Sequence, residues 1–123
     1  MFNDKTPNYW LEIAKHDIEA SKILIEKKSY PDVIIYHLHQ ATEKILKAKI
    51  LDNNGQIEYI HDLERLYKIL IKLNDSYSKI ENEIIILQSY YTDFRYPKSE
   101  FLNKKDLLKA IKLFEKIKKN LLY

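Results

Sequence analysis

Apolar and polar positions in the first half of the chain follow the period of two α-helices. Apolar side chains recur at helical spacing over residues 7–28, after Thr6 and Pro7 supply an N-cap and a first-turn proline. A second start signal around Pro31 opens a helix that runs to about residue 51, where Asn and Gly residues stop it. Because the connection is so short, the two helices must fold back antiparallel, as in a helical bundle.

The second half of the chain predicts three further helices. His61 and Asp62 precede an apolar stripe over residues 63–73 and are expected to cap that helix. A fourth helix covers about 79–95 and a fifth about 103–122. The sequence therefore predicts an all-α fold, an up-and-down antiparallel bundle of four to five helices, in one domain that spans residues 1–123.

Composition excludes several kinds of protein. The 123 residues include one Gly and no Cys, which rules out a disulfide framework, a zinc ribbon, a thiol nucleophile and a glycine-rich phosphate loop. No apolar run approaches the roughly 20 residues of a membrane span, and no signal peptide is evident. The four His do not have metal-ligand spacing. We therefore expect a cytoplasmic protein with no membrane contact and no metal.

Charge is unevenly distributed along the chain. The net charge is +3, but residues 98–123 carry eight Lys against three acidic residues, which leaves residues 1–97 slightly acidic. Five of these lysines form a stripe opposite the apolar face of the fifth helix. The stripe is typical of a soluble surface, and RNA or an acidic partner protein is the alternative. Its members are Lys105, Lys109, Lys112, Lys116 and Lys119.

The second helix is unusual in being apolar on two sides. One side carries a strip with alanines that allow close helix approach, and a second strip lies about 100° round the helix. Such a helix either sits at the centre of the bundle or faces another subunit. The first strip is Ile34, Leu38, Ala41, Ile45 and Ala48, and the second is Ile35, Leu46 and Ile50.

Between these two sides runs a polar strip of His37, Gln40, Lys44 and Lys47. Their spacings of three and four residues place the side chains on one surface. The strip indicates either a solvated seam with local ion pairs or an anion cleft in which the two lysines hold phosphates.

Two further charged residues stand on apolar faces. Asp17 lies near the middle of the apolar face of the first helix, and Arg95 continues the apolar line of the fourth. A buried carboxylate needs a partner, and guanidinium suits bidentate pairing. The alternatives are an ion pair between Asp17 and Arg95 that fixes helix packing, and an Arg95 that faces a phosphate.

Four separate patches of the chain resemble one known family. The patches are Trp10, Ala14, Asp17 and Ile18; Gln40, Ala41, Glu43, Lys44, Leu46, Lys47 and Ala48; His61, Asp62 and Leu63; and Tyr91, Arg95, Tyr96 and Pro97. Their order and spacing are similar to those of the HEPN domain. The resemblance implies a helical bundle that forms a homodimer, often encoded beside a minimal nucleotidyltransferase as a toxin and antitoxin pair. By position it implies that Arg95 and Tyr96 lie near the dimer cleft, with Lys44 and Lys47 as phosphate contacts for a nucleotide such as ATP or for RNA.

The sequence departs from the family in one respect. Many HEPN proteins are metal-independent ribonucleases with a His several residues after the Arg, and no His follows Arg95 here. The usual general acid or base is therefore missing, which favours a binding and interaction module over an enzyme. The alternatives are a ribonuclease in which His37 or His61 replaces that His across a dimer, and a purely structural dimeric scaffold. In a pair with a nucleotidyltransferase, Tyr91 or Tyr96 could be a target of modification.

Overall fold

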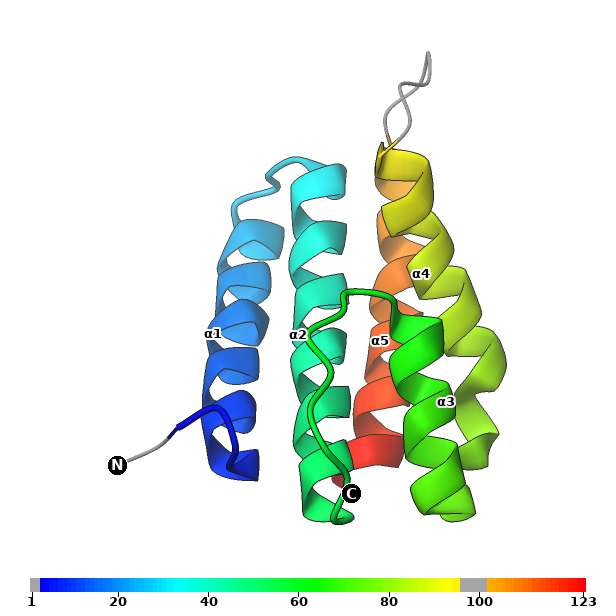
Figure 1. The fold of residues 1–123 in the computed structure, drawn as a ribbon. Coiled ribbons are helices and arrows are strands. Elements are labelled where there is room, and N and C mark those ends of the chain that lie inside the picture. The colour runs from blue at the N-terminus through cyan, green and yellow to red at the C-terminus, as the bar shows by residue number, and fades with distance from the viewer. Residues whose placement is uncertain (1–2, 96–101) are drawn as a thin grey trace.

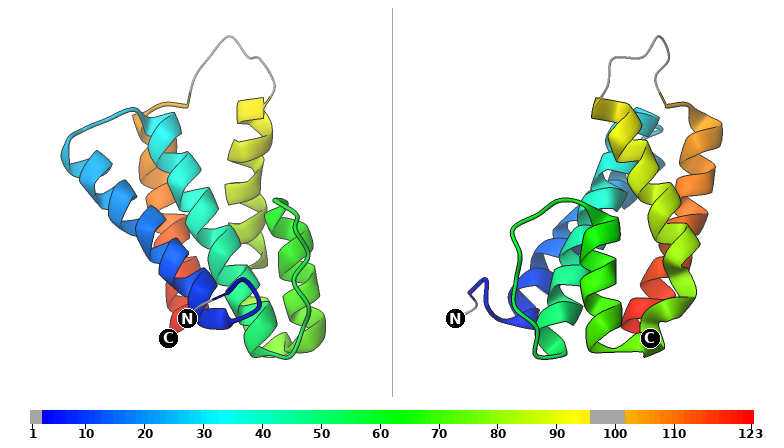
Figure 2. Two further views of the ribbon diagram at one scale, coloured as in Figure 1. Left: turned by 60° about the vertical axis from the view of Figure 1, so that its left-hand side comes forward. Right: turned by 45° about the vertical axis from the view of Figure 1, so that its right-hand side comes forward.

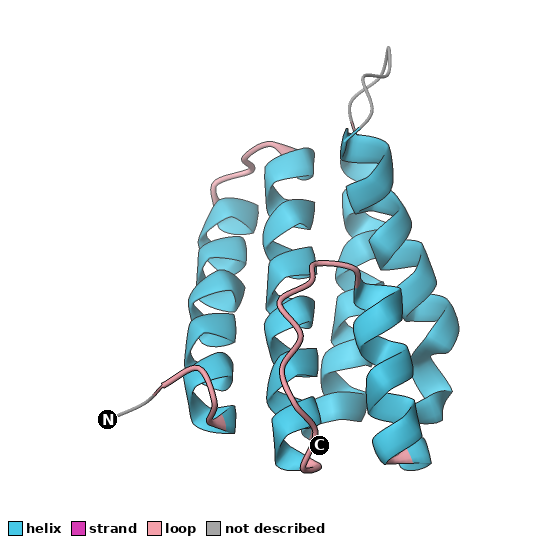
Figure 3. Cartoon of the chain, in the orientation of Figure 1, coloured by secondary structure: helices cyan, strands magenta, loops and turns pink. Residues whose placement is uncertain are grey.

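The computed structural model describes residues 3–95 and 102–123, with only the backbone for residues 92–95. Within these residues the structure is helical and contains no strand (Figures 1 and 3). The elements are α1 (Pro7–Glu26), α2 (Pro31–Asp52), α3 (Leu63–Leu73), the 3₁₀ helix η1 (Asp75–Ile80), α4 (Glu81–Arg95) and α5 (Lys104–Leu122). The predicted all-α bundle is confirmed, and the helix boundaries agree with the sequence to within about two residues.

Helix α2 is the central element of the bundle. It packs against α1 along its length and also contacts α3, α4 and α5 (Figures 1 and 2). Both of its apolar strips are buried within the chain, so the central position, not a face toward another subunit, accounts for its two apolar sides. The buried residues of these strips are Ile34, Ile35, Leu38, Ala41, Ile45, Leu46, Ala48 and Ile50.

The helix ends follow the sequence signals in part. The Asp62 carboxylate caps α3 by accepting hydrogen bonds from the Glu64 and Arg65 N–H groups, at 3.0 and 3.3 Å. Thr6 occupies the N-cap position of α1 but makes no capping bond, because its hydroxyl donates to the Asn3 carbonyl at 2.8 Å. Thr6 therefore stands at the predicted N-cap position, but the predicted capping hydrogen bond from its side chain is absent.

The approach to α4 differs from the sequence expectation. The chain forms η1 before α4 begins at Glu81, whereas helical spacing alone predicted one helix from about residue 79. The Asn74 side chain starts η1 by accepting a bond from the Ser76 N–H at 3.1 Å, and the Tyr67 hydroxyl donates to the Tyr77 carbonyl at 2.5 Å. These side-chain bonds hold a tight turn that apolar periodicity does not register.

The loop after α2 returns along that helix, so that α3 begins beside the middle of α2 (Figure 1). Residues 53–62 run back along α2 (Figures 1 and 2). At the start of this loop, a Cβ on Gly55 would lie 2.5 Å from Leu73 Cδ1 and 2.7 Å from Ile50 Cγ2. Any larger residue would force the Leu73 and Ile50 side chains to shift, so glycine suits this close approach, and the loop beyond it brings His61 to the side of α2.

Candidate functional site

The first polar group on α2 is the Asp17 cluster, formed by Asp17, His37 and Lys44. One carboxylate oxygen of Asp17 lies 2.9 Å from His37 Nδ1, and the other accepts a hydrogen bond from Lys44 Nζ. The Asp17 side chain is 12% exposed, whereas those of Lys44 and His37 are 21% and 27% exposed. The cluster joins α1 to α2 and keeps contact with water at all three side chains.

The second group, the Glu43 cluster, is formed by Glu43, Lys47 and His61 and is far drier. Glu43 Oε2 accepts from Lys47 Nζ at 3.2 Å, and these two side chains are 4% and 3% exposed. Lys47 Nζ also lies 4.9 Å from the centre of the Trp10 ring. A buried charge persists only when it is paired, and here each member of the pair neutralises the other.

His61 connects this buried pair to the surface. Its Nδ1 lies 2.9 Å from Glu43 Oε1, yet the side chain is 68% exposed. An ionised carboxylate only accepts, so Nδ1–H donates and Nε2 is the nitrogen left for chemistry. Within the described part of the chain, no hydrogen-bond partner faces Nε2. A histidine whose one nitrogen is fixed by a carboxylate has the geometry of an oriented acid or base.

The other histidine of α2, His39, is buried and has no carboxylate as a hydrogen-bond partner. Its Nε2 lies 2.9 Å from Gln88 Oε1, which also accepts from the Leu63 N–H at 2.9 Å. Burial lowers the pKa of His39 below its ordinary value, against the weaker opposing effect of the Gln88 bond. His39 is therefore neutral near pH 7, and with Gln88 it fastens α2 to α4 and to the start of α3.

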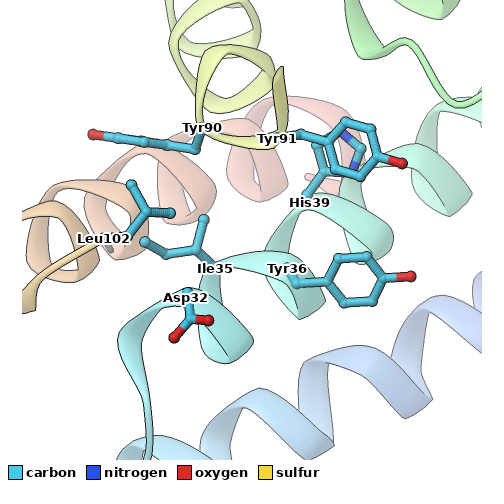
Figure 4. Close-up of a pocket in the computed structure, with 7 residues that line it drawn as sticks. All are labelled: Asp32, Ile35, Tyr36, His39, Tyr90, Tyr91 and Leu102. Carbon is cyan, nitrogen blue, oxygen red and sulfur yellow. The ribbon is translucent and has the colours of Figure 1, made fainter. Parts of the chain in front are cut away.

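A small pocket opens beside His39 at the end of α4 (Figure 4). The Tyr91 ring stacks on the His39 ring, with centroids 4.4 Å apart and planes 18° from parallel. The Tyr36 ring extends from α2 in the same general direction as Tyr91 and faces it across an opening. The remaining lining residues are Asp32, Ile35, Tyr90 and Leu102.

The structure locates the charged residues predicted from sequence only in part. Asp17 does lie on the inner face of α1, and its described partners are His37 and Lys44. Arg95 is the last residue of α4, four positions after Tyr91, but its side chain lies outside the described residues, as do Tyr96 and Pro97. The pairing of Asp17 with Arg95 therefore stays a prediction.

The polar strip of α2 does not form one continuous surface. Lys47 points inward under Trp10 and has no free surface for a phosphate, whereas Lys44 is partly exposed and bound to Asp17. Gln40 is partly buried, and its amide nitrogen lies 3.5 Å from His39 Nδ1. Of the predicted strip, only Gln40, His37 and Lys44 keep access to solvent.

Local spacing missed the part played by Glu43 and His61. Glu43 belongs to a run of local pairs that is typical of an exposed helix face, and His61 was expected to cap α3. Instead Asp62 alone caps the helix, and His61 contacts Glu43 across 18 residues. The sequence signal that could have predicted the burial of Glu43 is the two-sided apolar pattern of α2, because residues that lie between two buried sides of a helix are themselves covered.

The described residues contain neither a metal-ligand cluster nor a membrane-spanning helix. No group of three or more His, Asp or Glu side chains there is arranged to hold a metal ion. None of the helices in that part of the chain combines the length and apolar content needed to cross a bilayer.

The described residues form a small all-α bundle whose central helix carries two carboxylate, lysine and histidine clusters, and comparison with known proteins identifies the family. The model of the HEPN domain matches residues 7–121, so the chain belongs to the HEPN family. A protein of Methanocaldococcus jannaschii named "Putative toxin MJ1304" is 33% identical over 107 residues, which cover 81% of this chain and 69% of that protein. No solved structure matches the chain.

Proposed function

We propose that this HEPN protein is the toxin-like member of a two-protein pair and that it binds the phosphate of a nucleotide or of RNA at the Arg95 end of α4. The observation that carries the proposal is the likeness over most of the domain to a protein named as a toxin. Arg95 lies inside the matched region and ends α4. Its guanidinium suits bidentate contact with phosphate, and Tyr96 follows it directly.

Affinity measurements with Arg95→Ala test the phosphate site. ATP and a short oligoribonucleotide are titrated against the wild type and the variant, after circular dichroism has shown that both fold. Arg65→Ala is a matched control, since the chain has only two arginines and Arg65 stands on α3, 65% exposed and 3.7 Å from Glu58. We expect loss of about tenfold or more in affinity for Arg95→Ala alone. Equal affinities in all three proteins would contradict the proposal.

The same proposal includes a homodimer. Large apolar side chains are exposed where α1 turns into α2, among them Ile23 at 59%, Tyr30 at 73% and Val33 at 39%. Large apolar side chains left exposed near one turn would be covered by contact with another protein surface. Sedimentation of the wild type should give a dimer, and Val33→Glu should give a monomer. Leu108→Glu, at an exposed apolar position on α5, is the control expected to stay dimeric.

The partner in the pair is proposed to be a minimal nucleotidyltransferase. The lysine stripe of α5 is exposed in this structure, and Lys105, Lys109 and Lys112 lie on its outer side. If the neighbouring gene encodes such a protein, the two products should co-purify after co-expression. Replacement of Lys109 and Lys112 by Glu tests whether an acidic partner surface docks there, because charge reversal should abolish capture and leave the helical signal unchanged.

A second candidate function, metal-independent cleavage of RNA, is favoured by one observation. His37 and His61 each have Nδ1 at 2.9 Å from a carboxylate, which leaves Nε2 for proton transfer. His37→Ala or His61→Ala should then reduce cleavage about 100-fold or more in the presence of a chelator. Intact RNA after incubation with the wild-type protein would dismiss this candidate and leave the binding function in place.

A further inference from the structure

The segment between α2 and α3 is fastened to the rest of the protein by side chains. Within the described residues, no backbone hydrogen bond joins residues 56–61 to any other part of the chain. This segment, here called the strap, runs along α2 (Figures 1 and 2). Its ion pair with α3, between Glu58 and Arg65 at 3.7 Å, is largely exposed and adds little. A segment without backbone hydrogen bonds opens at a lower free energy than the helices beside it.

Two hydrogen bonds close the strap, and both are made by exposed side chains. The Tyr59 hydroxyl donates to Asp4 Oδ2 at 2.5 Å, and His61 Nδ1 lies 2.9 Å from Glu43 Oε1. Tyr59 is 65% exposed and the His61 side chain is 68% exposed, so water competes for both bonds. Between them, Ile60 packs partly buried against the core. Few contacts therefore have to break for the strap to open.

Both hydrogen bonds lead to the same buried lysine. Asp4, which accepts from Tyr59, also accepts from Trp10 Nε1 through its backbone carbonyl at 2.7 Å. The Trp10 ring lies 4.9 Å from Lys47 Nζ, which donates to Glu43 at 3.2 Å. Glu43 in turn holds the second hydrogen bond of the strap. The contacts thus form a closed ring around Lys47, and loss of the Tyr59 bond frees the segment that holds Trp10 over it.

The buried ion pair gains hydration when the strap opens. Lysine is rarely fully buried, and pairing returns only part of the hydration that both charges lose, yet Lys47 and Glu43 are 3% and 4% exposed. We propose that the strap is a gate over the Glu43–Lys47 pair. Closed, it shields Lys47 from anions in solution and occupies Nδ1 of His61, and open, it presents all three side chains to solvent. The inference goes beyond the proposed function, because it requires neither phosphate binding nor a partner protein.

The reactivity of Lys47 toward an amine-acetylating reagent tests the gate, because the amine reacts only when solvent reaches it. Tyr59→Phe and Asp4→Ala remove the same hydrogen bond from its two ends, and each should raise the acetylation rate of Lys47 about fivefold, measured by peptide mass spectrometry. The double variant should react no faster than either single variant, because both changes break one contact.

Two controls accompany this measurement. Tyr123→Phe alters a tyrosine that is 89% exposed and makes no side-chain hydrogen bond within the described residues, and it should leave the rate at Lys47 unchanged. Lys112, exposed on α5, should react at the same rate in every protein and so calibrates the reagent.

Low concentrations of urea separate opening of the strap from global unfolding. A short segment exposes little surface when it opens, so the wild-type rate at Lys47 should stay nearly constant up to about 1 M urea. A rate that rises with urea as steeply as the unfolding equilibrium does would overturn the gate. Equal rates at Lys47 in the wild type, Tyr59→Phe and Asp4→Ala would overturn it as well. Neither measurement involves a nucleotide or RNA, so the gate and the proposed phosphate site succeed or fail independently.

Discussion

The Asp17 cluster and the Glu43 cluster combine the same three kinds of side chain, yet they differ in their contact with water. In the Asp17 cluster the carboxylate and the lysine keep 12% and 21% of their side-chain surface exposed, and in the Glu43 cluster only 4% and 3%. The first cluster lies between two helices, whereas the second lies under Trp10 and the loop that carries His61. The Asp17–Lys44 pair therefore joins two helices, whereas the buried Glu43–Lys47 pair holds an exposed histidine in place.

This difference has an energetic consequence. A partly hydrated ion pair contributes little to the free energy of unfolding, and removal of one partner costs little, because water takes that partner's place. A dry pair has already lost its hydration, so removal of one member leaves a charge that nothing compensates. The two clusters should respond very differently to the same substitution.

The largest effect is expected for Glu43→Ala. The variant leaves Lys47 charged and buried and should lower the free energy of unfolding by about 3–5 kcal/mol, measured by urea denaturation followed by circular dichroism. Glu19→Ala, at an exposed position of α1, is the control and should change it by less than about 0.5 kcal/mol. A cost below about 1 kcal/mol for Glu43→Ala would show that Lys47 reaches water, and the contrast between the clusters would fail.

Asp17→Ala should cost less, about 1–2 kcal/mol. His37 and Lys44 lose their acceptor but stay partly hydrated, and Ala favours the helix more than Asp does. Asp17→Asn keeps the shape and removes the charge, so it separates the hydrogen bonds from the ion pair. A loss as large as that of Glu43→Ala, in the same urea experiment, would mean that exposure does not set the energy of these clusters.

The sequence predicted the helices well and the clusters poorly, for a physical reason. Helix limits depend on local signals such as Pro7, Pro31 and the Asp62 cap, which act within one turn. The burial of Glu43 depends on a loop that returns along α2, and that contact spans 18 residues from Glu43 to His61. Local spacing cannot distinguish an i,i+4 pair on the surface from the same pair covered by a distant segment.

The protein should lose stability in acid because His39 on α2 is buried in its neutral form. Burial lowers the pKa of His39 in the folded state below its ordinary value of 6.5, so the unfolded chain takes up the proton first. This contribution to stability is complete above about pH 6.5 and is lost as the pH falls toward the lowered pKa, with a slope of at most about 1.4 kcal/mol per pH unit.

His39→Gln is the variant that isolates this effect, because its amide can still donate to Gln88 but does not titrate. Urea denaturation at a series of pH values between 7.5 and about 5 should show a smaller loss of stability for the variant than for the wild type. Parallel curves would show that titration of His39 does not contribute to the loss of stability in acid.

The smallest change in stability is expected for the double variant Glu43→Leu with Lys47→Met. Apolar side chains of similar volume remove both desolvated charges at once, and the flexible Met can still pack under Trp10, so the free energy of unfolding should stay within about 1 kcal/mol of the wild type. Removal of either charge alone would then destabilise the fold, whereas removal of both together would not. Because the pair's further hydrogen-bonded contact is with His61, such a result would mean that the Glu43 cluster orients an exposed histidine and does not hold the fold together. A double variant as unstable as Glu43→Ala would instead make the ion pair a true structural element, and His61 only its surface neighbour.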